Sequence, residues 1–511
     1  MPPSDNEPEN YSIDEMMERL KRTPSENPED GEEVIRADGT HAIRLKKKKR
    51  RSNQPTQEQK KARRRVRIAR ATAALVIIFL AIVVVIAAIS YANSSFFREK
   101  LLRKIELTTG ASVEMEQFRM NPQSANASTL TLRWPTGNIL NNLALRGLKA
   151  EIFPSSFLGK LMSGDELIVE AGSLELQFPQ PTQPMRAFTQ SSEEQIILFN
   201  RYRTPKLNVT LGNPKSPLLS VYKTEASLNT EIDGIKSQLS LYKGDITIPQ
   251  WPKLRLDRAM IEFVDGETKV VSIQIQHETD SYGQLELRGA VYPNQPDILS
   301  TLSVSLDSFQ MSGITSPSFG RLISGRIDTM EIPKSNFLSF QTTENSSPTL
   351  KVAFQVNPSS RIEVRGFPFL GGLAQALDNT WFKEPLFDSN ANGLIEREDG
   401  TLILRNFDFV NKNRIALRGE IRVSSDQKLS GNLEIGLAEP VMGTSGNARL
   451  KALFGPARDG FHWLSLTIGG AVAAPTDDFK ERLAAVGTAP PERSSSPEDS
   501  KATFEELTRP K

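Results

Sequence analysis

The sequence contains no cysteine and only three histidines, His41, His277 and His462. The absence of cysteine excludes disulfides, thiolate metal sites and cysteine nucleophiles. The histidines stand far apart, and neither a second histidine nor a ligand cluster accompanies any of them, so we expect no metal site. A Gly-rich phosphate loop, a nucleophile elbow and a zinc motif are also missing. We therefore expect a protein that is not an enzyme, with no catalytic residue and no cofactor.

Charge is distributed in three zones. Residues 1 to 43 carry 12 acids and 4 bases, residues 44 to 70 carry 14 bases and Glu58, and the chain from Ala71 onward carries 45 bases and 48 acids. A nearly neutral body argues against a nucleic-acid partner. The basic zone has no interleaved aromatics and directly precedes an apolar run, so contact with anionic lipid headgroups explains it better than RNA binding.

The apolar run is ATAALVIIFLAIVVVIAAI, from Ala71 to Ile89, and no charge occurs between Arg70 and Arg98. About 20 helical residues span the roughly 30 Å hydrocarbon core of a bilayer, which predicts a transmembrane helix over residues 71–91. Because the basic zone precedes the span, the positive-inside rule predicts a cytoplasmic N-terminus. We expect a single-pass protein of the inner (cytoplasmic) membrane with its body in the periplasm. Asn-x-Ser/Thr triplets at Asn93, Asn126, Asn208 and Asn345 keep a eukaryotic type II membrane protein as an alternative.

The two ends of the chain have the composition of disordered segments. Residues 1–70 form an acidic and then basic cytoplasmic arm, and residues 486–511 form a tail rich in Pro, Ser and Glu. Within the arm, YSIDEMMERLKR has a capping-box spacing at Ser12 and Glu15. Its apolar side chains share one helical face, which makes this segment a candidate for docking a cytoplasmic protein partner. The candidate docking residues are Ile13, Met16, Met17 and Leu20.

Beyond a helical stalk at residues 92–108, residues 109–485 alternate apolar and polar side chains with period two, which is typical of β-strands. We interpret ELIVEAGSLELQFP as two strands joined by a turn at Gly172. The apolar side of these strands is the candidate lipid-facing surface. Its candidate residues are Leu130, Leu132, Trp134, Leu167, Val169, Leu174, Leu176 and Phe178.

Hairpin signals recur along the body. Asp-Gly pairs at 233–234, 265–266 and 399–400 each separate strand-like runs, and Asp-Gly favours tight hairpin turns. The segment RIALRGEIRVSSDQKLSGNLEIGL predicts two antiparallel strands with apolar residues of one parity. Helical patterns are short, the main one lying near residues 371 to 382. The predicted fold class is mainly β: a long, mostly antiparallel, curved and groove-like sheet with a few short covering helices, on one N-terminal transmembrane helix.

A short block occurs twice, as SFLGKLMSG at residues 156–164 and SFGRLISG at residues 318–325. Ser156 or Ser318 would cap one helical turn and Gly164 or Gly325 would end it, with Phe157 or Phe319 facing the sheet. We interpret each block as a short cover placed between two strands.

The chain resembles the AsmA-like family of bacterial envelope proteins. The resemblance lies in the anchor, in FREKLLRKIELTTGASVEMEQFRM after it, in SSFLGKLMSGDELIVEAGSLELQF, and in the closing strands from ALRGEIRVSSDQKLSGNLEIGL to LTIGGAVAAPTDDF. It implies a long β-groove body that handles lipid or supports outer-membrane assembly. It carries no catalytic residues to this chain.

Two functions follow as hypotheses. In the first, the β-groove of a single-pass envelope protein binds or passes phospholipid or another acyl lipid, or supports outer-membrane assembly. If some 25 strands stacked at about 4.8 Å each, such a groove would reach at most about 120 Å. In the second, the protein is a membrane-anchored scaffold or signalling protein that binds a periplasmic protein, with its β body closed. The two hypotheses differ in whether the apolar face is open.

Overall fold

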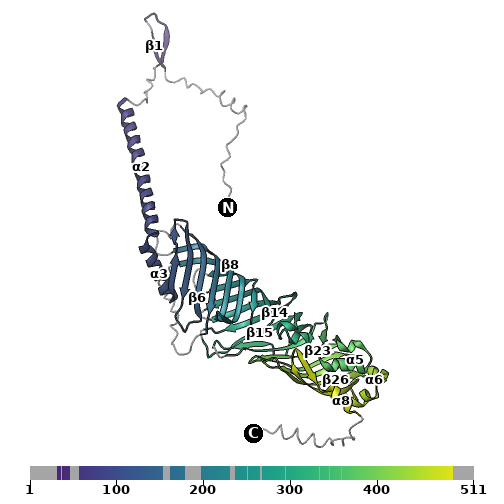
Figure 1. Cartoon of the computed structure of the whole chain (residues 1–511). Helices are drawn as coiled ribbons and strands as arrows, with labels where there is room; N and C mark the ends of the chain where they lie inside the picture. Colours follow the sequence, from purple (N-terminus) through teal and green to yellow (C-terminus); the bar gives the residue numbers. More distant parts are fainter. Residues whose placement is uncertain are drawn as a thin grey trace, which may run out of the picture. The chain divides into compact units, whose positions relative to one another are not determined.

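Figure 1 shows the computed structural model of the chain. It describes residues 31–35, 37–45, 57–153, 162–178, 197–230, 236–249, 251–264, 267–293, 295–332, 334–343, 346–357 and 359–486. The docking residues Ile13, Met16, Met17 and Leu20, and the whole C-terminal tail from residue 487, lie outside them. Contacts divide the chain into two units, Met1–Val83 and Val84–Lys511.

In the first unit, a hairpin lies within the arm that we expected to be disordered. Its strands β1 (Gly31–Ile35) and β2 (His41–Leu45) are antiparallel, with Ile35 opposite His41. The turn follows the Asp-Gly signal, since Gly39 has a φ of 78° and the Asp38 carboxylate accepts hydrogen bonds from the Thr40 backbone and hydroxyl.

Helix α2 (Gln57–Ala92) contains the apolar run. Its stretch Thr72–Ala92 has 21 residues and a mean hydropathy of 3.2, and its most apolar window contains no side chain buried by the protein. This helix is therefore long and apolar enough to cross a membrane. An exposed apolar surface of this size is unfavourable in water, and insertion into a membrane would cover it.

A second helix, α3 (Ser95–Thr109), follows after a break at Asn93 and Ser94. The Ser94 hydroxyl caps α3 by accepting a hydrogen bond from the Phe97 backbone at 3.2 Å, and Gly110 ends it with a left-handed φ of 67°. The predicted stalk is thus a separate helix with its own cap. One side of α3 packs on the first strands of the sheet through Leu101, Leu102 and Ile105.

The body is one large sheet. Its longer strands are β3 (Ser112–Glu116), β5 (Ser124–Arg133), β6 (Leu140–Ile152), β7 (Met162–Leu176), β8 (Ile197–Asn213), β9 (Ser216–Thr230), β10 (Lys236–Tyr242), β12 (Leu254–Val264), β13 (Glu267–His277), β14 (Asp280–Val291), β15 (Ser300–Asp307), β19 (Phe337–Phe340), β20 (Thr349–Val356), β23 (Asn390–Glu398), β24 (Thr401–Asn411), β25 (Ile415–Val423), β26 (Leu429–Ala438), β28 (Phe461–Ala471) and β29 (Ala474–Asp477).

These strands pair in the order just given, each with the next. Closed circuits in the pairing are local, as where β11 (Asp245–Thr247) pairs with both β9 and β12. Within the described part of the chain, no ladder joins β29 back to β3. The prediction of a large, mostly antiparallel sheet is confirmed.

Strand β7 corrects one prediction. We expected a turn at Gly172, but residues 162–176 form a single strand. A side chain at Gly172 would lie 3.0 Å from Leu207 and 3.1 Å from Leu145, so this glycine makes room for leucines on both neighbouring strands. Strand β7 pairs antiparallel with β6 and parallel with β8, whereas every other ladder among the described residues is antiparallel.

A line of backbone irregularities, which we call the crease, crosses the first strands of the body. Residues with positive φ interrupt them in turn: Gln117 between β3 and β4 (Arg119–Met120), Gly147 within β6, Lys223 within β9 and Lys243 between β10 and β11. The register between β8 and β9 shifts on both sides of Leu207. Bulges of this kind bend strands and shift their alternation by one residue. Apolar side chains on both sides of the crease therefore stay on one face of the sheet.

From β12 onward, the apolar face is covered by a large core. Residues such as Val352, Phe354, Ile395 and Leu433 are at most 1% exposed. The covering elements are η1 (Met311–Gly313), η2 (Phe319–Arg321), α5 (Pro368–Ala376), η3 (Thr380–Lys383), α6 (Glu439–Thr444), α7 (Ala448–Leu453), α8 (Phe479–Ala485) and a small sheet of β17 (Ile323–Ser324), β21 (Ile362–Val364) and β22 (Leu386–Phe387). Figure 1 shows these helices gathered at the far end of the body.

The two sequence blocks differ in structure. In the second, Phe319, Leu322 and Ile323 are buried as we expected, but the hydroxyl that caps η2 belongs to Ser316, and Ser318 donates instead to Gln427. Most of the first block lies outside the described residues. Its Gly164 lies within strand β7 and so does not end a helix. A side chain at Gly164 would collide with the Glu151 carbonyl.

Candidate functional site

The apolar face is not buried equally along the sheet. Seven aliphatic side chains on β7, β8, β9, β10 and β12 are only half-buried and belong to none of the buried clusters. We call them the apolar strip. They are Leu174, Leu176, Val209, Leu211, Leu228, Leu239 and Ile261.

Strand register lines up these side chains. On one side of the crease, Leu174 is opposite Val209, and Leu176 is opposite Leu211. On the other side, Leu239 lies between Leu228 and Ile261. The strip therefore consists of two rows of branched side chains, one on each side of the crease.

The residues between the two parts of the strip are buried. Val169, Leu207 and Ala226, which lie there, are between 5% and 8% exposed. At one end of the strip, α3 packs over β3 and β5. At the other end, Val221 and Leu241 already contact the large core. The strip therefore lies between the strands that α3 covers and the strands that the large core covers, and the residues between its two rows are buried.

The predicted lipid-facing residues fall into different environments. Leu130, Leu132 and Trp134 pack with α3, and the Trp134 indole donates a 3.0 Å hydrogen bond to the Thr109 carbonyl. Val169 lies at the floor of the crease, and Leu167 packs beside it. Leu174 and Leu176 belong to the strip, and Phe178, just past the end of β7, is half-buried.

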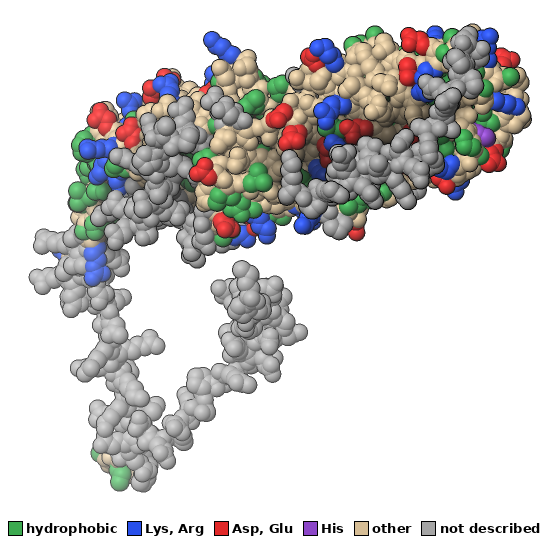
Figure 2. Space-filling model, turned by 90° about the horizontal axis from the view of Figure 1, so that it is seen from below, with side chains coloured by type: hydrophobic (Ala, Val, Ile, Leu, Met, Phe, Trp, Pro, Cys, Tyr) green, Lys and Arg blue, Asp and Glu red, His purple; other side chains and the backbone are tan. Residues whose placement is uncertain are grey.

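Charges are mixed over the rest of the surface. Figure 2 shows Lys and Arg side chains interspersed with Asp and Glu over the described part of the face in view. Several form ion pairs across neighbouring strands, such as Arg203 with Glu225 at 2.9 Å and Arg418 with Asp408 at 2.7 Å. Such a surface presents no extended field of one sign to a polyelectrolyte.

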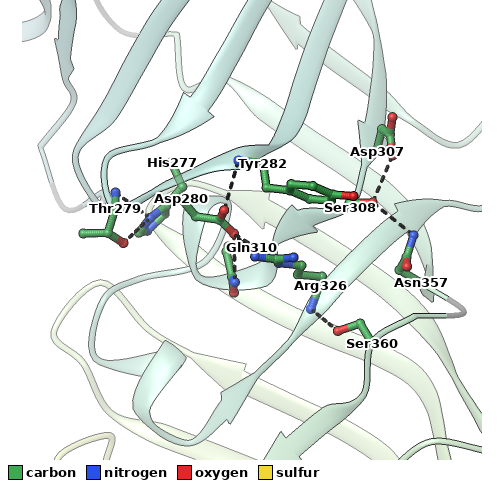
Figure 3. A network of polar contacts seen from close by, with 10 residues as sticks. All are labelled: His277, Thr279, Asp280, Tyr282, Asp307, Ser308, Gln310, Arg326, Asn357 and Ser360. Carbon is green, nitrogen blue, oxygen red and sulfur yellow. Dashed lines mark hydrogen bonds and ion pairs between the residues drawn. The ribbon is translucent and has the colours of Figure 1, made fainter.

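A polar network joins the β13–β14 hairpin to β16 (Phe309–Gln310) and β18 (Arg326–Thr329) (Figure 3). The Asp280 carboxylate accepts hydrogen bonds from Gln310 and Arg326, each at 3.1 Å. Burial acts to raise the pKa of Asp280, but the Tyr282 backbone N–H, Gln310 and Arg326 outweigh it and hold this pKa below its ordinary value. The Arg326 guanidinium also stacks over the Tyr282 ring at 5.1 Å. The network is a structural tie between elements.

Each histidine of the body has a polar partner close in sequence. His277 lies 3.0 Å from the Thr279 hydroxyl, and His462 lies 2.9 Å from the Gly455 carbonyl. Over the described residues, no three His, Asp or Glu side chains gather as a metal ion would need. Glu396, on β23, forms ion pairs with Lys351 and Arg405 at 3.2 Å each.

Sequence reasoning missed one charged residue of the core, Arg397 on β23. It is 8% exposed, and its guanidinium donates to the Ile314 and Thr315 carbonyls at 3.4 and 3.2 Å and stacks on Trp251 at 4.1 Å. No ion pair to it is found among the described residues. The signal was its parity, because Arg397 alternates with the buried Ile395.

Comparison of the chain with protein-family models, with curated proteins and with solved structures gives no match in any of the three.

Proposed function

We propose that this is a membrane-anchored lipid-binding protein whose apolar strip holds the acyl chain of one lipid. The observation that carries the proposal is the contrast within one face of one sheet. The strands after β12 pack their apolar side chains into the large core, but the strip side chains are only half-buried and lie outside every buried cluster. Apolar surface left open on both sides of a crease gains about 25 cal/mol per Å² when a hydrocarbon guest covers it.

The dimensions of the strip fit one guest. Five adjacent strands, β7 to β10 and β12, span about 19 Å at about 4.8 Å per spacing. One leaflet of a bilayer contributes roughly half of the 30 Å hydrocarbon core, so a strip of this length accommodates a single lipid tail. A conduit between two membranes would need the open face to continue along the sheet. The covered floor and ends therefore favour binding of lipid over its passage along the body.

The anchor sets the topology in this proposal. By the positive-inside rule, the basic residues before the span favour an N-terminus in the cytoplasm and a body on the opposite side of an inner membrane. The kinship to AsmA-like envelope proteins, and a role in outer-membrane assembly, stay predictions from the sequence segments alone.

The test compares two adjacent rows of the same ladder. Leu174→Gln with Val209→Gln places two amides in the strip, whereas Glu175→Gln with Thr210→Gln alters the next register pair, which faces the other side of the sheet. Full-length protein is purified from cells, and bound lipid is counted by native mass spectrometry. Loss of contacts equivalent to two or three methylenes costs about 2 kcal/mol, so the first variant should retain about thirtyfold less lipid.

The control variant should retain as much lipid as the unchanged protein. If the unchanged protein carries no acyl lipid, or if both variants lose it equally, the strip is not a lipid site. The scaffold function, with a periplasmic protein as partner, would then replace the proposal.

A further inference from the structure

A second feature lies beside the end of the membrane helix. It is a pocket of about 500 Å³ between Asn93, the first residue after α2, and the strands β4 and β5. It shares no residue with the apolar strip, from whose first strand, β7, it is separated by β6. Phe118 of the pocket packs in one cluster with Val169 of the crease. Its lining residues are Asn93, Phe118, Arg119, Met120, Asn121 and Asn126.

The pocket is fixed to the helix by one side chain. Asn93 accepts a hydrogen bond from the Met120 backbone N–H at 2.8 Å and donates one to the Met120 carbonyl at 2.7 Å, so its amide pairs with β4 as a strand would. The same amide donates to the Ile89 carbonyl at 2.8 Å. Since Asn93 directly follows the apolar stretch Thr72–Ala92, the pocket stands at the level where hydrocarbon gives way to headgroups.

The lining suits a phosphate ester. Arg119 is exposed and makes no ion pair with any described residue, and no carboxylate lines the pocket. The Asn126 amide stands opposite Arg119 in the β4–β5 ladder. A guanidinium binds phosphate oxygens through two parallel N–H groups, and an amide adds a further donor.

The surroundings suit an interface with lipid. The Phe118 ring stacks on Phe97 with centroids 6.4 Å apart and gives the pocket an apolar wall. Tyr91 and Phe96, which are 50% and 64% exposed, contact each other next to it. Aromatic side chains collect at the headgroup level of membranes because their rings are amphipathic.

We propose that this pocket binds the phosphodiester headgroup of one phospholipid of the bilayer that α2 enters. Arg119 pairs with the phosphate, the Asn126 amide donates to a second oxygen, and Phe118 contacts the first methylenes of the lipid. This site is separate from the strip, so it anchors the base of the body whether or not the strip carries a guest.

The experiment uses the full-length protein in nanodiscs of equal parts phosphatidylglycerol and phosphatidylcholine. After transfer to detergent, native mass spectrometry counts the phosphatidylglycerol retained. A basic residue at a membrane surface contributes about 1 kcal/mol, so Arg119→Gln should lower retention about fivefold. Asn126→Asp, which places a like charge beside the phosphate, should lower it at least as much. Arg146→Gln removes an exposed arginine of β6 outside the pocket and should change nothing.

The same spectra separate two sources of phosphate. Transfer is repeated in inorganic phosphate and in chloride at equal ionic strength. If Arg119→Gln lowers bound inorganic phosphate but leaves phosphatidylglycerol retention unchanged, the lipid assignment is overturned. Equal retention by Arg119→Gln and Arg146→Gln overturns the site altogether. Neither result bears on the strip, whose own variants leave Arg119 intact.

Discussion

Substitution of Arg397 tests the energetics of the covered half of the sheet. Desolvation lowers the pKa of Arg397 from its ordinary value to about 10. At 1.36 kcal/mol per pKa unit, the charged guanidinium costs the folded state about 3 kcal/mol. Against this cost stand two hydrogen bonds to carbonyls and the stacking on Trp251. Hydrogen bonds to a charged group contribute about 1.5–3 kcal/mol each, so the opposing contributions nearly balance.

The two obvious replacements separate these contributions. Arg397→Met removes the charge and its desolvation cost but leaves the Ile314 and Thr315 carbonyls without a donor, and we expect a loss of about 1 kcal/mol. Arg397→Lys keeps a buried charge and loses the planar stacking and one of the two carbonyl bonds. We expect it to destabilise the protein by about 2–3 kcal/mol, more than the methionine variant does.

The assay is urea unfolding of the full-length protein in detergent, followed by tryptophan fluorescence. The pH dependence carries a sign. Because the folded pKa is lowered, the unfolded chain binds more protons above about pH 10, so the contribution of this group to stability rises with pH from there to its ordinary pKa. In that window the free energy of unfolding of the wild type should rise relative to that of Arg397→Met, and at lower pH the difference between the two should stay constant. A lysine variant as stable as the wild type would refute the reasoning.

Two further predictions concern the body. Asp280→Asn should lower the free energy of unfolding by about 1–2 kcal/mol near pH 7, because it weakens the hydrogen bonds from Gln310 and Arg326. The carboxylate's contribution is complete only above about pH 3.8, so the difference from wild type should vanish as the pH falls through the lowered pKa of Asp280. A difference in stability that persists in acid would contradict this. In α5, the added methyl group of Gly371→Ala meets no neighbour within 4 Å, so this variant should stabilise the protein by about 0.5–1 kcal/mol. The methyl group of Gly372→Ala meets the Phe479 ring at 2.7 Å, so this variant should destabilise the protein. Thermal unfolding measures both variants, and equal melting temperatures would exclude the close packing of α5 on α8.

The sequence predicted best where partners are close along the chain. Strands β25 and β26 pair as their parity indicated, with Ile415 opposite Leu437, Leu417 opposite Ile435 and Val423 opposite Leu429. The turn at Asp399 and Gly400 has the two positive φ angles that Asp-Gly favours. A short hairpin loop fixes register locally, so alternation alone was sufficient.

Prediction failed where the partner is distant. Nothing within β7 indicates that its second neighbour is parallel, because that choice depends on the whole connection between Leu176 and Ile197. Nor does alternation reveal what covers an apolar face. Leu132 and Leu174 have the same pattern in the sequence, yet α3 buries the first and leaves the second half-exposed.

The parallel ladder between β7 and β8 has a consequence for the order of folding. Strands β3 to β7 follow one another as antiparallel neighbours, and so do β8, β9 and β10, whereas β7 and β8 meet only after the chain between Leu176 and Ile197 has crossed back. We therefore expect the ladder between β7 and β8 to form after the antiparallel pairs on either side of it.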